Sequence, residues 1–211
     1  MWRRAPYDPP MSHDASDPAH RSPWVRRSRR TAYENPWLSL WHDEVSRPDG
    51  LPGIYGVVHF ANLAVGIVPL DAHDRVVLVG QFRYTLDAWS WEIPEGGVPL
   101  DEDPLDGARR ELREETGLTA SSWDELGRVH LSNSVTDESG ILYLATGLTE
   151  GEAAPDGTEA LEVRRVPFAE ALAMTLDGRI TDALSVVGLQ RVALARVAGA
   201  RGSVRPERPP G

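Results

Sequence analysis

The segment from Glu95 to Leu118 constrains the fold more than any other part of the chain, because it predicts a helix with both ends marked. Asp103 is a typical N-cap residue, and Pro104 follows it at the first helical position, where the missing N–H has no partner to lose. Gly117 supplies the left-handed residue that commonly ends a helix. We therefore expect a Gly-Gly loop at residues 96–97, then a helix from residue 104 to about residue 116.

Three glutamates share one face of this predicted helix. Glu111, Glu114 and Glu115 stand at positions i, i+3 and i+4, so their Cβ atoms lie within about 5–6 Å of one another. Like charges at this spacing destabilise an isolated helix, and a hard divalent cation such as Mg²⁺, which prefers oxygen ligands, compensates them well. The alternative interpretation is a solvated acidic face paired with the neighbouring arginines.

The spacing around the helix favours the metal interpretation. Gly96 is followed after five residues by Glu102 and after seven more by Arg110-Glu111-Leu112-x-Glu114-Glu115-x-Gly117-Leu118. This gapped pattern resembles the signature of the Nudix hydrolases at every fixed position. Four further segments resemble the branch that contains the ADP-ribose and nucleoside diphosphate sugar pyrophosphatases: Gln81-Phe-Arg83-Tyr84, Trp91-Glu92-Ile-Pro94, Gly178-Arg-Ile-Thr-Asp182, and the strand-turn-strand stretch from Glu44 to Gly56.

The resemblance implies an α/β fold, a Nudix α/β/α sandwich with a mixed central sheet and an N-terminal antiparallel strand pair. It also implies hydrolysis of a pyrophosphate bond between a nucleoside monophosphate and a sugar phosphate, with Mg²⁺ as the cofactor and Mn²⁺ as an alternative. Divalent ions serve this reaction by neutralising the phosphate oxygens and activating a bound water.

Carried over residue by residue, the resemblance makes Glu111 and Glu115 metal ligands, with Glu114 as a ligand or a water contact. A backbone carbonyl of Glu95 or Gly96 completes the metal shell. Arg110 pairs with a neighbouring carboxylate, for which Glu102 is the candidate.

A general base is expected on a loop outside the signature. Glu159 is the best match, and Glu162 and Glu138 are weaker candidates. The expected substrate contacts are Arg83 on the diphosphate, Glu138, and Tyr55 across the interface of a homodimer. Trp91, or alternatively Trp89, is expected to stack on a base or line the pocket, and the competing interpretation of a tryptophan beside a central strand is a core position. The loop Ser132-Asn133-Ser134 departs from the Ser-Pro-Gly that this branch often carries, which leaves the sugar or base undefined.

Composition limits the partners. The net charge is −10, and the first 30 residues carry seven arginines against three aspartates, so the rest of the chain is more acidic still. This acidity argues against nucleic acid as the main partner. The chain has no cysteine, which excludes a thiolate metal site and a cysteine nucleophile. It shows no secretory signal and no apolar stretch long enough to cross a membrane, so we expect a cytoplasmic enzyme.

The order of predicted elements is strands, helix, strands, helices. We expect strands at residues 37–45, 55–60, 62–69, 75–84, 127–131, 141–147 and 161–166, and helices at residues 168–176 and 182–197. The predicted division is a disordered leader at residues 1–31, one domain at 32–198, and a disordered tail at 199–211.

Two other functions compete with this interpretation. A Nudix hydrolase acting on a nucleoside triphosphate, a dinucleoside polyphosphate or an RNA cap would share the signature but not the flanking segments. A ligand-sensing Nudix domain of a transcriptional regulator usually loses the glutamates and adds a DNA-binding domain, whereas the glutamates are intact here.

Overall fold

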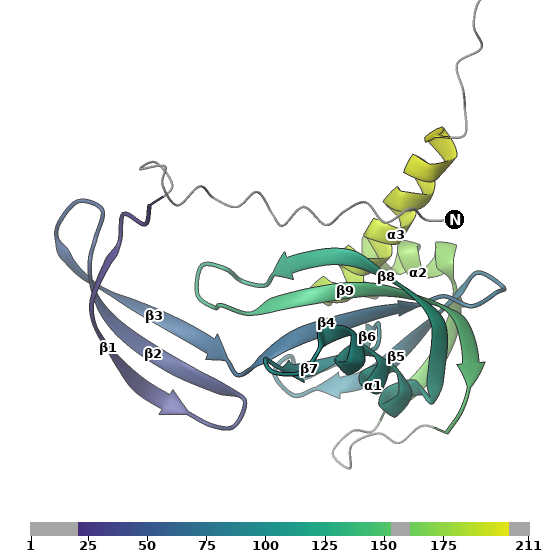
Figure 1. Cartoon of the computed structure of the whole chain (residues 1–211), viewed down its shortest axis with the longest axis horizontal. Helices are drawn as coiled ribbons and strands as arrows, with labels where there is room; N and C mark the ends of the chain where they lie inside the picture. Colours follow the sequence, from purple (N-terminus) through teal and green to yellow (C-terminus); the bar gives the residue numbers. More distant parts are fainter. Residues whose placement is uncertain (1–20, 153–160, 203–211) are drawn as a thin grey trace, which may run out of the picture.

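The computed structural model describes residues 21–152 and 161–202, whose strands form three sheets (Figure 1). The N-terminal sheet contains β1 (Val25–Glu34), β2 (Leu38–Ser46) and β3 (Pro52–Phe60). The mixed sheet contains β4 (Asn62–Pro69), β7 (Glu95–Pro99), β8 (Leu118–His130) and β9 (Ser139–Glu150). The third sheet contains β5 (Arg75–Arg83), β6 (Ala88–Glu92) and β10 (Glu162–Pro167). The helices are α1 (Pro104–Thr116), α2 (Phe168–Asp177) and α3 (Ala183–Gly202).

The mixed sheet runs in the order β7-β4-β9-β8. Strands β4 and β9 are parallel, with Val65 opposite Ile141, while β7 and β8 pair antiparallel with their neighbours. Strand β7 pairs with β4 so that Gly96 lies opposite Val65, which fixes the position of the residues just before α1. The mixed α/β architecture expected from the sequence is confirmed.

Alternating side chains of the central strands form two apolar layers, as the pleat of a strand requires. Ile67 of β4 packs in one layer with Leu112 of α1. Val68, the next residue of β4, packs in the other layer with Leu189 of α3. Helix α1 therefore covers one face of the strands, and α2 and α3 cover the other (Figure 1).

Strand β5 lies at the centre of the third sheet, between β10 and β6. Its residues 76–79 are fully buried, as the sequence predicts for a strand that is covered on both faces. None of the helices in the described ranges has the length and apolar character that a membrane crossing requires.

The N-terminal sheet lies to one side of the other two sheets (Figure 1). Strands β2 and β3 form the predicted hairpin, but β1 adds a third strand on the free edge of β2. The prediction of a disordered leader is therefore wrong for residues 25–31, which belong to β1. Arg29 of β1 pairs with the buried carboxylate of Asp43 at 2.6 Å and lies 3.8 Å over the ring of Trp41, contacts that composition does not reveal.

Three other bounds differ from the predictions. The segment Glu95–Pro99, expected as a glycine loop, is strand β7, because its backbone pairs with β4. Helix α3 extends to Gly202, past the predicted end of the domain at residue 198. Strands β8 and β9 form a long antiparallel pair that begins and ends well outside the short segments that the sequence indicated. Residues 1–20 and 203–211 lie outside the described residues.

Candidate active site

Helix α1 begins and ends where the sequence predicts. The Asp103 side chain accepts hydrogen bonds from the backbone N–H groups of Leu105 at 2.9 Å and Asp106 at 3.3 Å. At the other end Gly117 adopts a φ of 73°, and its N–H donates to the carbonyl of Arg113 at 2.9 Å. Both caps satisfy backbone groups that a helix end otherwise leaves unpaired, so the frame that carries the glutamates is rigid.

Two glutamates of α1 face the start of β7. Glu115 is only 3% exposed, and its Oε2 accepts a hydrogen bond from the backbone N–H of Glu95 at 3.1 Å. The carboxylate of Glu111 lies against Gly96, where a Cβ atom would stand 2.2 Å from the Cδ of Glu111. Glycine is therefore required at position 96 for this approach of strand and helix.

Arg110 bonds to three carboxylates on and beside the acidic face of α1. Its Nη1 donates to Glu111 at 2.7 Å and to Glu114 at 3.1 Å, and its Nη2 donates to Glu102 at 3.4 Å and to the carbonyl of Gly97 at 3.3 Å. Partial burial acts to lower the pKa of Arg110, but the charge of Glu111 and the three carboxylate hydrogen bonds outweigh it and raise that pKa. The predicted pairing of Arg110 with Glu102 is present, and Arg110 links it to two signature glutamates.

A second ion-pair cluster joins β5, β6 and β7. The Nε of Arg83 donates to Glu92 at 2.9 Å, and its Nη2 donates to Glu95 at 2.7 Å and also to Glu92. Glu92 is 2% exposed, so its carboxylate is buried against the guanidinium of Arg83. Burial acts to lower the pKa of Arg83, but its bonds to these acids raise it overall. Because Nε and Nη2 are committed to carboxylates, Arg83 is placed to orient Glu95.

Glu95 is the least compensated acid in this region. Its Oε2 is buried and has no hydrogen-bond partner among the described residues. Burial raises the pKa of Glu95, the negative charges of Asp182 and Glu92 raise it further, and Arg83 only partly opposes them. An unsatisfied carboxylate oxygen surrounded by other acids is a site that a cation would stabilise.

The donors at the β7–α1 junction fit a divalent cation by their chemistry. They are carboxylate oxygens, which hard cations prefer, and the charge of Glu115 is one of those that raise the pKa of the buried Glu95, whose Oε2 is unpaired. Within residues 21–152 and 161–202 no group of three or more acidic or histidine side chains is arranged to hold a metal ion. In this structure Arg110 bonds Glu111 and Glu114 directly, so ligation by these two acids would replace those bonds.

The residue just before helix α3 lies near the site, although sequence reasoning assigned it no role there. Asp182 precedes α3 and accepts a hydrogen bond from the N–H of Ser185 at 2.7 Å. Its charge raises the pKa of Glu95 and also that of Glu138, although burial is the larger cause at both glutamates. In the sequence, Asp182 and Glu92 are recognisable only as members of two segments that flank the signature. A charged residue inside or beside an apolar segment is the signal that identifies both.

The remaining predicted residues are spread over several elements. Trp91 precedes Glu92 in β6, so its ring lies on the opposite face of that strand, under Arg164 at 4.3 Å. The hydroxyl of Tyr55, in β3, donates to the carbonyl of Ser134 at 2.8 Å. Glu138 is half-buried on the loop before β9, whereas Glu162 is exposed and pairs with Arg164 at 3.0 Å. The predicted base Glu159 lies outside the described residues.

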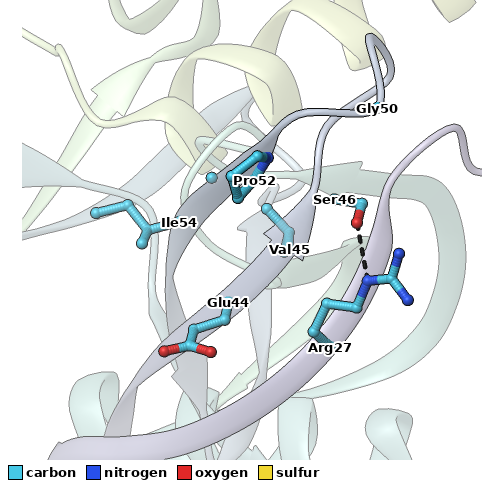
Figure 2. A pocket seen from close by; sticks show the side chains of 8 residues that line it. Arg27, Glu44, Val45, Ser46, Gly50, Pro52 and Ile54 are labelled. Carbon is cyan, nitrogen blue, oxygen red and sulfur yellow. Dashed lines mark hydrogen bonds between the residues drawn. The ribbon is translucent and has the colours of Figure 1, made fainter.

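A hollow of about 580 Å³ lies on the N-terminal sheet, near the turn that joins β2 and β3. Figure 2 shows its lining, including Glu44 and Ile54, and the hydrogen bond of 2.8 Å from the Nε of Arg27 to the Oγ of Ser46. Glu44 is the one acid among its lining residues. The hollow is therefore a feature of the N-terminal sheet and is separate from the acids of β7 and α1.

Comparison with known proteins agrees with this geometry. Residues 61–184 match the NUDIX domain family, and residues 24–58 match the nucleoside diphosphate sugar hydrolase N-terminal domain. The chain is 36% identical over 171 residues to an ADP-ribose pyrophosphatase of Mycobacterium tuberculosis, an alignment that covers 78% of this chain and 81% of the relative. It is 30% identical over 178 residues to a CMP-5'-(N-acetyl-N-hydroxy-3-aminopropyl)phosphonate hydrolase of Streptomyces rubellomurinus, covering 84% and 85% of the two chains.

A solved structure supports the fold. The crystal structure of an ADP compounds hydrolase superposes with a TM-score of 0.74 at 20% identity, covering 86% of this chain and 97% of that one. The signature helix, the N-terminal sheet and these matches agree with one another along most of the chain. The chain therefore belongs to the Nudix hydrolases, in the branch of the ADP-ribose and nucleoside diphosphate sugar pyrophosphatases.

Proposed function

We propose that this enzyme hydrolyses nucleoside diphosphate sugars, of the ADP-ribose or GDP-mannose type, to a nucleoside monophosphate and a sugar phosphate with Mg²⁺ or Mn²⁺. The observation that carries the proposal is the group of acids where β7 meets α1, in which the buried Oε2 of Glu95 has no partner among the described residues. The name of the Mycobacterium tuberculosis relative and the description of the N-terminal family support this choice of substrate.

In the proposed reaction one water molecule is added across the P–O–P linkage. The water oxygen forms a bond to one phosphorus, the bridging oxygen leaves with the other phosphate, and the water loses a proton to a base. Glu111, Glu115 and Glu114, with a backbone carbonyl of Glu95 or Gly96, would hold the cation. When bound, the cation supplies charge neutralisation of the phosphate oxygens and lowers the pKa of a coordinated water.

The protein's own side chains prepare this site. Arg110 keeps Glu111 and Glu114 side by side before substrate arrives, and Arg83 with Glu92 fixes the side chain of Glu95. Side chains held in place before substrate arrives favour phosphoryl transfer, and the bonds from Arg110 to Glu111 and Glu114 would give way when these acids hold the cation.

The proposed base is Glu159. Among the described acids, Glu138 is the alternative, because burial and the charge of Asp182 raise its pKa toward the range in which a carboxylate accepts a proton efficiently near neutral pH. Glu159→Ala, Glu138→Ala and Glu162→Ala enzymes, assayed side by side, separate these assignments. We expect the Glu159 variant to lose most of the turnover. If the Glu159 variant turns over as fast as the parent, the general base is instead Glu138 or Glu162, whichever variant has the lower turnover.

The function is tested with a panel of nucleoside diphosphate sugars, a CMP conjugate and nucleoside triphosphates, each with Mg²⁺, Mn²⁺ or a chelator, scoring release of nucleoside monophosphate. We expect turnover of the sugars only with a cation, and loss of at least about 100-fold in kcat for Glu115→Gln at an unchanged melting temperature. Glu170→Gln, at an exposed glutamate of α2, is the matched control and should keep the parent's rate. An active Glu115→Gln enzyme would refute the assignment of the metal site.

We also propose that the enzyme is a homodimer formed through the N-terminal sheet. Strand β1 is exposed along its whole length, and Trp37, Leu40 and Ile54 expose apolar surface on or beside this sheet. A second copy of the chain would cover this surface, and Tyr55 of one subunit would then lie close to the other subunit. Light scattering on the parent and on Ile54→Glu tests this proposal, since a charge at a buried interface should favour monomers. A parent that is monomeric at micromolar concentration would contradict it.

A further inference from the structure

A second hollow, of about 250 Å³, lies between helix α1 and strand β8. Its lining includes Asp106 and three arginines of α1 together with Thr119 and Trp123 of β8, the arginines being Arg109, Arg110 and Arg113. Three arginines against one aspartate is an unusual grouping in a chain of net charge −10. The proposed reaction makes no use of this hollow.

The hollow and the reactive acids occupy different sides of α1. Arg109 and Arg113 are one helical turn apart on the side toward β8, whereas Glu111 and Glu115 face β7. Arg110 stands between the two sides, because it lines the hollow and also bonds Glu111. A ligand in the hollow would therefore bind outside the proposed reaction centre.

The arginines of the hollow differ in how far they are already paired. Arg109 donates to Asp106 at 2.7 Å, and Arg110 serves the glutamates of the signature. The guanidinium of Arg113 forms no hydrogen bond or ion pair with any residue of 21–152 or 161–202. Its place in the last turn of α1 suits the helix dipole, but the dipole does not account for three guanidinium groups around one hollow.

Trp123 gives the hollow an aromatic wall. Its Nε1 donates to the carbonyl of Ala120 at 3.1 Å, and its ring meets the ring of Tyr143 edge-on, with centroids 6.3 Å apart. The indole is therefore held in one orientation and has no free polar group to offer. Planar guanidinium groups beside a fixed aromatic surface match a phosphate ester that carries a ring.

We propose that this hollow is a second anion site that binds a phosphoryl group, either free phosphate or the phosphate of a nucleoside monophosphate. Arg113 and Arg109 bind the phosphate oxygens, and Trp123 contacts the base when a nucleotide is bound. Because the attraction is between partly exposed charges, the affinity falls as the salt concentration rises.

The test is calorimetric titration of the metal-free full-length protein at low ionic strength with AMP, with inorganic phosphate and with adenosine. Metal-free conditions remove the cation that would link the acids of the reaction centre to a phosphate, so we expect no phosphate binding there. We expect AMP to saturate one site per chain, adenosine not to bind, and the Arg109→Gln/Arg113→Gln protein to bind AMP at least about tenfold more weakly. Arg26→Gln/Arg30→Gln removes the same charge from β1 and should stay within about twofold of the parent.

Two further variants identify the ligand and keep the test valid if the double variant is unstable. Equal affinities for phosphate and AMP assign the site to free phosphate, whereas a tighter AMP whose advantage is lost in Trp123→Leu assigns it to a nucleotide. Arg113→Gln alone breaks no bond to a described residue, so it tests the site even when the double variant melts early. The proposal is overturned if neither AMP nor phosphate saturates by about 10 mM, if adenosine binds as AMP does, or if Arg113→Gln binds like the parent.

Discussion

Substituting Gly96 by alanine is the most direct test of how β7 and α1 meet. A Cβ atom at residue 96 would lie 2.2 Å from the Cδ of Glu111 and 2.4 and 2.5 Å from its two oxygens. Real Cβ atoms do not approach other atoms this closely, so the carboxylate of Glu111 must leave its place. Its bond of 2.7 Å to Arg110 is then lost.

The size of the effect follows from these contacts. Moving Glu111 to another rotamer and losing a charge-assisted hydrogen bond at a partly exposed pair together lower the free energy of unfolding by about 1–3 kcal/mol. For a domain of this size each kcal/mol lowers the melting temperature by about 2–4 °C. The enzyme should therefore stay folded at 25 °C, while kcat with Mg²⁺ falls at least about 100-fold because a metal ligand is displaced.

Gly97→Ala is the matched control for this experiment. It adds the same methyl group to the adjacent residue of β7, where the nearest atom is the side-chain nitrogen of Asn62 at 2.9 Å. That end of a flexible side chain can move, so kcat should stay within about threefold of the parent. The assay is release of nucleoside monophosphate from ADP-ribose, with thermal melting of all three proteins. A Gly96→Ala enzyme that keeps the parent's kcat would refute the role of Glu111.

Three further predictions concern stability. Burial and nearby acids raise the pKa of Glu95 above its unfolded value, so the metal-free folded state binds more protons and its free energy of unfolding falls as pH rises above about 4.3. Urea unfolding between about pH 5 and about pH 8 should show that the free energy of unfolding of Glu95→Gln does not fall with pH in this way. If that free energy changes equally with pH in the variant and the parent, the prediction is contradicted. Arg29→Gln leaves the buried carboxylate of Asp43 unpaired, so unfolding should become easier by about 1–3 kcal/mol and amide exchange in β1 should accelerate. Ser185→Ala removes the acceptor of the Ile93 N–H at 2.8 Å, which should cost about 1–3 kcal/mol in urea unfolding, and a neutral result would mean that the N–H finds water.

The helix of the signature was predictable because all its signals are local. Asp103, Pro104 and Gly117 mark its ends through their own backbone preferences and short-range hydrogen bonds, and the structure confirms each one. The spacing of the glutamates likewise depends only on helix geometry. Sequence reasoning therefore placed Glu111 and Glu115 on the correct element.

Features that depend on distant partners were missed. Arg29 and Asp43 are 14 residues apart, so nothing in the arginine-rich segment itself predicts β1. The bond from Ile93 to Ser185 spans 92 residues and brings the start of α3, with Asp182, to the acids. The engagement of Arg83 by Glu92 and Glu95 is also a consequence of strand pairing, which is why the sequence assigned Arg83 to substrate alone.

Hydrogen bonds join the loop before β9 to strand β3, across the boundary between the N-terminal sheet and the rest of the chain. The N–H of Val58 donates to Val135, the N–H of Phe60 donates to the carboxylate of Asp137 at 3.1 Å, and His59 meets the same carboxylate at 2.5 Å. A protein that began at residue 61, where the NUDIX match begins, would keep every acid of the signature but would lose all of these bonds to β3. The position of this loop therefore depends on residues outside the NUDIX match, and a protein without them should show faster amide exchange in the loop while the signature helix stays protected.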